Sequence, residues 1–463
     1  MTTLRSRSLP KPLSPNACTV LAQRYLARNR KGAVAESPAQ LFWRVARDIA
    51  RAERNYPATT RPHGLAGQFF DLMARLDFLP NSPTLMNAGR PLQQLSACFV
   101  LPVDDGLTSI FDAVKFQALI HQSGGGTGFS FSRIRPRADR VATTNGIASG
   151  PVSFMRVFNL STDVIKQGGA RRGANMGILR VDHPDILEFI ALKQNPSEMT
   201  NFNLSVGITD RFMRAVQRRQ TLSLINPHTG KIVRRVAAEA VFDQLVQAAW
   251  QSGEPGVVFL DTINRANPTP QLGAIEATNP CGEQPLLPYE SCTLGSINVA
   301  NFVSVRSGKP AIDYDRLHRI IPTAVRFLDN VLDRSHFPLQ AIKDQTALTN
   351  PFGQLVKQFD TVVPIDAGVR NALTICQRLT CHQILTASVN VRLDHHAHDA
   401  FFTRCQLCSN IRRYFHLTLI FLTAVTVRKV DHHARRNTRF GHLGTGGIDA
   451  GCIIVWLFAA TQD

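Results

Sequence analysis

The sequence is short of acidic residues and of long apolar runs. Asp and Glu number 34 against 52 Lys and Arg, which leaves a formal net charge of +18. Such a surplus favours phosphate-bearing ligands or nucleic acid through long-range attraction, but it carries no information about the fold. The apolar segment 415–427 has 13 residues, fewer than the roughly 20 that a membrane-spanning helix needs. We therefore expect no membrane anchor.

Cysteine is also scarce, with 9 in 463 residues, and no apolar leader follows the basic start. We expect a reducing, cytoplasmic compartment in which these cysteines are free for chemistry. The length excludes a small disulfide scaffold and allows one large domain or two to three ordinary ones. With 44% hydrophobic and 19% charged residues, the chain fits neither a disordered protein nor a membrane bundle.

Four segments differ in character. Residues 1–38 are rich in Arg, Ser and Pro, which indicates a flexible basic lead-in. Residues 39–78 carry apolar side chains at helical spacing and predict an N-terminal helical region. From 79 to 343, short β-like runs alternate with helix-like stretches, which predicts an α/β body with largely parallel strands. The predicted runs are 97–101, 203–208 and 256–260, with a helix over 242–250. Residues 344–463 form a divergent tail.

The composition of this tail changes abruptly. Residues 351–463 hold 8 of the 14 His and 5 of the 9 Cys, whereas the last Glu of the chain is Glu290. The spacing of Cys405 and Cys408 is compatible with metal binding, but no regular zinc-finger pattern accompanies it, so we predict no metal site. Our hypothesis is that the sequence from about residue 344 comes from a shifted reading frame or an unrelated fusion.

The most informative segment covers residues 279–292. Its three prolines forbid a regular helix, so we expect an extended loop or finger. Alternation along such a loop would aim Cys281 and Glu283 the same way, and a thiol and a carboxylate could then address one substrate. The plain alternative is a Pro-rich surface loop with an incidental cysteine.

Other segments place this one in a wider pattern. In chain order they are Asn-Ser-Pro-Thr at 81–84, Ser-Ala-Cys at 96–98, Ser-Gly-Gly-Gly-Thr-Gly at 123–128, Gly-Gly-Ala-Arg-Arg-Gly at 168–173, Asn-Pro-Cys-Gly-Glu at 279–283 and Gly-Ser-Ile-Asn at 295–298. Together, over roughly residues 40–343, they resemble the ribonucleotide reductase large chain, most closely its adenosylcobalamin-dependent (class II) branch. The resemblance implies an N-terminal helical domain followed by about the first half of a ten-stranded α/β barrel. It also implies a truncated copy with a non-matching tail, and truncation of this kind can abolish activity.

The resemblance implies an oxidoreductase that reduces ribonucleotides, expected to be diphosphates, to 2′-deoxyribonucleotides for DNA synthesis. A thiyl radical at Cys281 would take the 3′ hydrogen, Glu283 would draw the 3′-hydroxyl proton, and Asn279 would hydrogen-bond the ribose and that carboxylate. Cys98 and Cys292 would form the redox pair that ends turnover as a disulfide. They can do so only if their Cα atoms come within about 4.4–6.8 Å; the alternative is two separate buried thiols on unrelated strands.

Substrate-binding residues also follow from the resemblance: Ser82, Thr84, Ala97 and Gly128. A hydroxyl such as that of Ser82, together with local backbone N–H groups, suits an anionic phosphate. The glycine run that includes Gly128 would permit close backbone approach to a ligand.

The family is regulated by deoxynucleoside triphosphates or ATP, which act as specificity effectors at a dimer interface. The resemblance implies effector contacts at Asp105, Arg171 and Arg172, the last two on a mobile loop over 167–175. It further implies a homodimer, adenosylcobalamin as cofactor, and a thioredoxin-like or glutaredoxin-like reductant. Few residues precede the helical part, so we expect no additional nucleotide-binding cone.

Two alternatives stay open. The first is a class I-type large chain whose radical comes from a separate subunit, because residue spacing cannot reveal the cofactor. The second is a non-catalytic basic protein that keeps a reductase framework and binds nucleic acid. The net charge supports it, but no aromatic platform or docking helix accompanies the basic residues, so nucleic acid is the less favoured partner.

Overall fold

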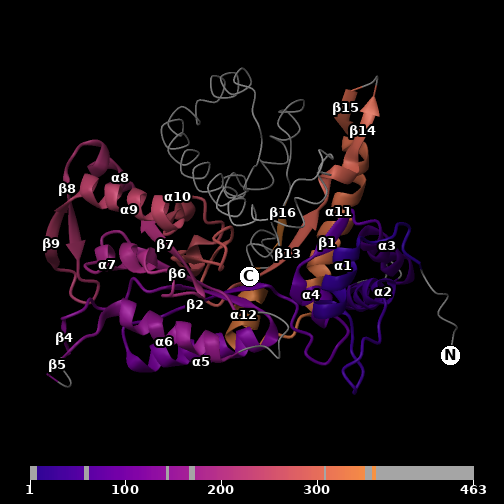
Figure 1. The fold of residues 1–463 in the computed structure, drawn as a ribbon, viewed down its shortest axis with the longest axis horizontal. Helices are drawn as coiled ribbons and strands as arrows, with labels where there is room; N and C mark the ends of the chain where they lie inside the picture. Colours follow the sequence, from indigo (N-terminus) through magenta and orange to yellow (C-terminus); the bar gives the residue numbers. More distant parts are fainter. Residues whose placement is uncertain are drawn as a thin grey trace, which may run out of the picture.

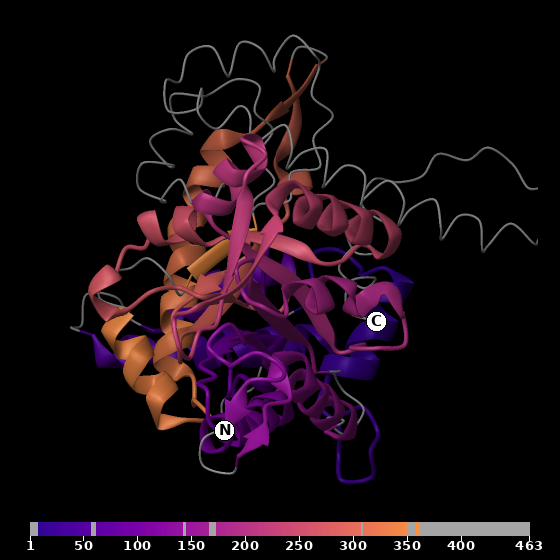
Figure 2. The same cartoon turned by 90° about the vertical axis from the view of Figure 1, so that its left-hand side faces the viewer.

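The computed structural model describes residues 8–56, 62–141, 145–165, 173–306, 309–349 and 357–360. A helical domain lies beside an α/β body built on one curled sheet (Figure 1). In the view turned by 90°, the magenta strands lie near the centre of the molecule with helices around them (Figure 2). The expected order of a helical region followed by half of a barrel is confirmed.

The helical domain begins where local sequence signals put it. α2 starts with a capping box, in which Ser37 Oγ accepts a hydrogen bond from Gln40 N and Ser37 N donates to Gln40 Oε1. The apolar residues predicted to share a face, among them Leu41 and Val45, are fully buried. The helices of this domain are α1 (Pro15–Val20), α2 (Pro38–Ile49), α3 (Pro62–Ala74) and α4 (Ser82–Asn87), with a π-helical turn at Leu21–Tyr25 and a 3-10 turn at Ala50–Asn55.

A distant helix completes the core of this domain. α11 (Tyr314–Arg334) lies more than 200 positions further along the chain, yet its Phe327 ring lies 4.9 Å from that of Phe69 and 5.4 Å from that of Phe78. A buried carboxylate also ties α11 to this domain: Arg316 donates to both oxygens of Asp77 at 2.7 Å. Because these contacts span more than 230 positions, helical periodicity alone could not predict them.

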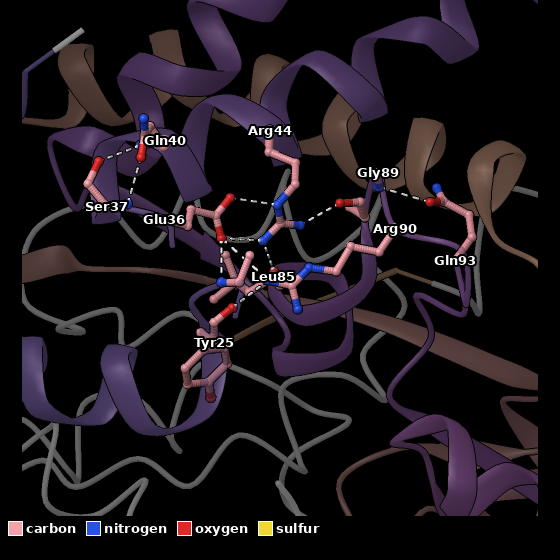
Figure 3. A network of polar contacts seen from close by, with 11 residues as sticks. Tyr25, Glu36, Ser37, Gln40, Arg44, Leu85, Gly89, Arg90 and Gln93 are labelled. Carbon is pink, nitrogen blue, oxygen red and sulfur yellow. Dashed lines mark hydrogen bonds and ion pairs between the residues drawn. The ribbon is translucent and has the colours of Figure 1, made fainter. Parts of the chain in front are cut away.

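Part of the expected flexible lead-in is ordered against this domain. The Glu36 carboxylate accepts hydrogen bonds from Ala27 N at 2.9 Å and from Arg44 Nε at 2.8 Å, and Arg90 Nη2 lies 3.4 Å from it (Figure 3). Burial opposes ionisation, but the hydrogen bond and charge of Arg44 hold the pKa of Glu36 below its ordinary value. The Glu36 carboxylate therefore helps to dock the stretch from α1 to Glu36, a role that the Arg, Ser and Pro content of this stretch did not indicate.

The central sheet has the strand order β1-β13-β2-β3-β6-β7-β10, with β16 added beside β13. β2, β3, β6, β7 and β10 run parallel, whereas β13 is antiparallel to both β1 and β2. The strands are β1 (Phe78–Pro80), β2 (Cys98–Leu101), β3 (Gly126–Ser130), β6 (Asn175–Arg180), β7 (Phe202–Ile208), β10 (Gly256–Phe259), β13 (Ser291–Ile297) and β16 (Lys357–Asp360). The three predicted strand runs match β2, β7 and β10.

Helices cover one face of this sheet. Phe99 and Phe129 point to that face and join one large core cluster with side chains of the covering helices. These helices are α5 (Leu107–Ser123), α6 (Gly150–Val164), α7 (Ile186–Ala191), α8 (Asp210–Gln217) and α9 (Ala238–Ser252). α9 includes the predicted helix over 242–250.

The alternate residues of the same strands face the other side. Cys98, Val100 and Met176 belong to a second, smaller cluster that also contains Ala277 and Leu286. Two-residue periodicity therefore separates a helix-covered outer face from an inner face. Of the predicted site residues, Cys98, Cys292 and Gly128 lie on this inner face.

The remaining elements are short. They are α10 (Leu260–Arg265), α12 (Gln340–Thr349), two 3-10 turns at Pro270–Leu272 and Val299–Phe302, a third at Leu192–Gln194, and the hairpins β4 (Arg140–Val141) with β5 (Gly146–Ile147), β8 (Thr221–Ile225) with β9 (Ile232–Ala237), and β14 (Val303–Arg306) with β15 (Lys309–Ile312). Within the described ranges, no helix has both the length and the apolar character required to cross a bilayer.

Candidate active site

A short hairpin carries the Asn-Pro-Cys-Gly-Glu segment across the inner face of the sheet. β11 (Ala277–Thr278) pairs antiparallel with β12 (Pro285–Leu286). Asn279 N donates to Gln284 O at 3.0 Å and closes the turn between the two strands. We call residues 277–286 the finger hairpin. Its non-helical form agrees with the prediction from its prolines.

Two glycines on β3 let the finger hairpin lie directly on the sheet. A Cβ at Gly128 would lie 1.7 Å from Thr278 O, and a Cβ at Gly126 would lie 2.6 Å from Pro280 Cγ. Any side chain at either position would therefore displace the hairpin. The close approach that we expected a ligand to make at Gly128 is made instead by the backbone of this chain.

Residues on the neighbouring strands extend this seat. Gly128, Met176 and Asn203 are register partners on β3, β6 and β7. Met176 Cε lies 3.6 Å from the Cβ position of Gly282, and Asn203 Nδ2 donates to Pro280 O at 2.7 Å. The sequence predicts a strand at Asn203 but no role for its side chain, because it does not show which residue lies opposite that side chain.

The Asn279 side chain organises the turn. It is fully buried. Its Oδ1 accepts hydrogen bonds from Gly282 N at 3.1 Å and from Gln284 N at 3.0 Å. Its Nδ2 donates to Glu283 Oε1 at 2.5 Å and lies 3.3 Å from Cys98 Sγ. One carboxamide thus fixes the turn, holds the carboxylate and contacts a cysteine 181 positions away in the chain.

Cys98 and Cys292 lie opposite each other in the antiparallel pair of β2 and β13. Residues opposite each other in such a pair have Cα atoms about 4.5–5.5 Å apart, which is within the range that a disulfide spans. Both are free thiols, and both are buried. The fold therefore brings the two sulfurs together, and the alternative of unrelated strands is wrong.

The surroundings of Cys292 favour the protonated thiol. Burial is the largest cause that raises the pKa of Cys292 well above its ordinary value, and the contact with Cys98 adds to it. The negative charges of Glu283 and Glu290 act in the same direction. At neutral pH this sulfur is accordingly S–H, the form that can give up a hydrogen atom.

Cys281 and Glu283 are arranged differently from the expected extended alternation. Gly282 between them has a φ of 89°, a left-handed conformation that L side chains rarely adopt. Cys281 is exposed, whereas the Glu283 carboxylate is turned toward Asn279. The segment is a tight turn because Asn279 accepts two of its backbone N–H groups, and simple alternation does not apply there.

Glu290 is a buried carboxyl group that our sequence analysis did not select. It has no exposed surface, and its Oε2 accepts a hydrogen bond from Leu287 N at 2.8 Å. Burial raises the pKa of Glu290 to about 7. Its place two residues before Cys292 is the signal that could have drawn attention to it.

Three of the expected substrate-binding residues, Ser82, Thr84 and Ala97, differ in their burial. Ser82 is half-buried at the start of α4, and its Oγ lies 2.8 Å from Tyr25 Oη. Thr84 is fully buried and donates to Leu95 O at 2.9 Å, so its hydroxyl is used inside the protein. Ala97 is buried beside the sulfur pair, where its N donates to Cys292 O at 3.0 Å.

The expected effector contacts are described only in part. Asp105 lies in the loop before α5, where its carboxylate accepts hydrogen bonds from Arg135 N at 3.1 Å and Arg135 Nε at 2.8 Å. His228 Nδ1 lies 3.3 Å from the same carboxylate. Arg171 and Arg172 lie outside the described residues.

The structure also describes little of the tail. Among the residues that it covers, no group of three or more His, Cys, Asp or Glu side chains is arranged to hold a metal ion. Cys405, Cys408 and the paired histidines of the tail lie outside the described residues.

We predict that mild oxidation with diamide joins Cys98 to Cys292, because the two thiols face each other across one strand pair. The rate should rise between about pH 7 and pH 9, since the raised pKa of Cys292 keeps its nucleophilic thiolate scarce at neutral pH. Peptide mapping by mass spectrometry identifies the link. Cys98→Ser should abolish it, and Cys18→Ser, which removes an exposed cysteine elsewhere, should leave it intact. A link between other cysteines in place of this one would contradict the geometry.

Comparison with known proteins gives matches over both parts of this fold. The family model for the ribonucleotide reductase all-alpha domain matches residues 11–93, and that for the ribonucleotide reductase barrel domain matches residues 96–354. The barrel match thus continues past residue 343, where our sequence analysis placed the start of the divergent tail.

Individual relatives agree with these matches. The vitamin B12-dependent ribonucleoside-diphosphate reductase of Mycobacterium tuberculosis is 51% identical over 74% of this chain and 49% of its own length. The protein of the same name from Thermoplasma acidophilum is 46% identical over 75% of this chain and 52% of its own. The ribonucleoside-diphosphate reductase large chain of Neurospora crassa is 28% identical over 77% and 41%. The chain spans about half the length of the curated relatives it matches.

The helical domain and the half-barrel are each matched in their own segment, and the chain belongs to the ribonucleotide reductase large-chain family.

Proposed function

We propose that this chain is the catalytic chain of an adenosylcobalamin-dependent ribonucleotide reductase that converts ribonucleoside diphosphates to their 2′-deoxy forms for DNA synthesis. The observation that carries the proposal is the meeting of Cys98, Cys292 and Glu283 around the finger hairpin that presents Cys281. Relatives named as B12-dependent reach 46–51% identity, against 28% for the large chain of N. crassa. This difference favours the class II branch over the class I alternative.

The three cysteines differ in exposure, and this difference supports different roles for them in the reaction. Cys281 is exposed at the turn of the finger hairpin, whereas Cys98 and Cys292 are buried beneath it. Cys281 is therefore the thiol of this site that fits a group arriving from outside the chain. Bound adenosylcobalamin would supply an unpaired electron through homolysis of its cobalt–carbon bond. Once the Cys281 thiol has given up its own hydrogen atom to that radical source, its thiyl sulfur can accept the hydrogen atom from C3′ of the ribose.

The carboxylate and the sulfur pair would complete the reaction. Glu283, held by Asn279, accepts the 3′-hydroxyl proton as general base. The 2′-hydroxyl leaves as water, and Cys98 and Cys292 together supply two electrons and two protons as they form a disulfide. Cys281 returns its hydrogen atom to C3′. The balance is one ribonucleotide and two thiols giving one deoxyribonucleotide, one disulfide and one water.

This balance implies a reductant, because the disulfide has to be reopened before the next turnover. A thioredoxin-like or glutaredoxin-like dithiol supplies the matching two electrons and two protons. For the substrate phosphates we retain Ser82, which is half-buried at the start of α4 with its Oγ beside the hydroxyl of Tyr25. We drop Thr84, which is fully buried with its hydroxyl bonded to Leu95 O.

A second copy of the chain is the proposed partner for the outer surface of α5 and α6. The two helices lie side by side (Figure 1). They expose large apolar side chains, namely Leu107, Phe111, Leu160 and Val164. Asp105 lies two residues before the start of α5, so an effector nucleotide bound there would lie beside this surface. Arg171 and Arg172 stay proposed as further effector contacts.

We predict that the chain sediments as a dimer and that Leu160→Glu shifts it to the monomer, because a charge in an apolar contact is costly to bury. Analytical ultracentrifugation with and without deoxynucleoside triphosphate measures this shift. Arg156→Glu, on the same helix but in a salt bridge with Glu198, changes charge without removing an apolar contact and is the comparison variant. A monomeric parent chain at all concentrations would contradict the proposed interface.

The function is tested by turnover with ribonucleoside diphosphate, adenosylcobalamin and a dithiol. The full chain should form deoxyribonucleotide, and Cys281→Ser should reduce product to background because a hydroxyl cannot replace the sulfur as hydrogen-atom carrier. Cys18→Ser, which alters an exposed cysteine far along the chain from the site, should match the parent. Equal product from the parent and Cys281→Ser, or no product from the parent under these conditions, would refute the proposal.

A further inference from the structure

The contact between Asn203 and the finger hairpin differs from the other contacts that hold this hairpin. Asn203 Nδ2 donates to Pro280 O at 2.7 Å. Thr278 rests on Gly128 at the base of the hairpin, and the Asn279 side chain holds the turn from within. Asn203 lies on β7, a strand of the central sheet. Its side chain donates a hydrogen bond to the carbonyl of the peptide that joins Pro280 to Cys281.

The position of Asn203 in the sheet is well defined. It is the register partner of Met176 on β6, whose side chain approaches Gly282 on the other side of Cys281. Its strand is hydrogen-bonded on both sides, to β6 and to β10. The side-chain amide of a residue on a paired strand thus donates a hydrogen bond to the peptide that precedes Cys281.

We propose that Asn203 is a positioning residue that sets the placement of Cys281 by fixing the Pro280–Cys281 peptide. The inference rests on the proposed function only in its consequence for turnover; the restraint on the hairpin is independent of it. The backbone carbonyl of Pro280 is one bond from the nitrogen of Cys281, so a shift of that carbonyl moves the Cys281 Cα with it.

This restraint matters because hydrogen-atom transfer needs close contact between the reacting atoms. Misplacement of a reacting group by about 1 Å can cost on the order of 100-fold in rate. Asn203 does not need to touch the substrate for this effect. Its removal should therefore lower kcat and leave the KM for the ribonucleotide unchanged.

The test compares Asn203→Asp with a matched control. Aspartate has nearly the same shape as asparagine, but it lacks the N–H donor and turns an oxygen toward Pro280 O. Asn195→Asp makes the same chemical change on an exposed turn, where the side chain acts as an acceptor for Ser197 N and a carboxylate can still accept. Asn203→Gln keeps an amide donor at a slightly longer reach.

Hydrogen–deuterium exchange of the peptide over 277–286 is the first measurement, because it does not require turnover. We expect exchange about tenfold faster in Asn203→Asp, because the loss of one hydrogen bond costs about 1.4 kcal/mol. The exchange rate of Asn203→Gln should be intermediate, and that of Asn195→Asp should equal the rate of the parent. In the turnover assay, Asn203→Asp should lose about 10- to 100-fold in kcat at constant KM.

Unchanged exchange in Asn203→Asp would overturn the proposal. Faster exchange with unchanged kcat in an active parent would overturn it as well, because the hairpin would then move without consequence for Cys281. If the parent chain forms no product, the proposed function fails, and the exchange measurement alone still decides whether Asn203 restrains the hairpin.

Discussion

The site depends on one backbone contact, in which the Thr278 carbonyl rests on β3 at Gly128. A Cβ there would come within 1.7 Å of the carbonyl oxygen, so the contact exists because the strand lacks a side chain at that point. Gly126, two residues earlier, faces the same side and leaves room for the Pro280 ring. With the hairpin seated at this depth, the Asn279 side chain lies 3.3 Å from the sulfur of Cys98.

The rest of the fold supports that contact from the other side. The alternate residues of β2 and β3 point to the outer face of the sheet. There Phe99 and Phe129 pack against helices in the largest core cluster. The helical domain restrains the approach to β2, since Leu95 N donates to Ser335 Oγ at 3.2 Å just after α11. Electrostatics then act on the enclosed sulfurs. Carboxyl groups nearby raise the pKa of Cys292 further than burial does alone, which keeps Cys292 as a thiol until it is oxidised.

The sequence predicted the features that depend on local pattern or on a distinctive motif. Helical spacing identified the face of α2, β-like runs identified β2, β7 and β10, and prolines excluded a helix in the finger hairpin. The motif resemblance paired Cys98 with Cys292, which spacing alone could not do. Features that depend on which residues meet in space were missed: the packing of α11 on α3, the docking of the lead-in through Glu36, and the contact of Asn203 with Pro280. The predicted substrate contact at Gly128 stays a prediction; the close neighbour that the structure shows there is the Thr278 carbonyl.

The most direct test of this account is the accessibility of Cys98 to iodoacetamide in Gly128→Ala. Cys98 is buried below Asn279, so its thiol should be alkylated slowly in the parent chain. The added methyl group should lift the hairpin, speed alkylation of Cys98, and lower the free energy of unfolding by about 1–3 kcal/mol, the usual cost of overpacking. Gly64→Ala, with no atom within 4 Å of its added Cβ, is the control and should leave Cys98 protected. Equal protection of Cys98 in Gly128→Ala and in the parent would contradict the account.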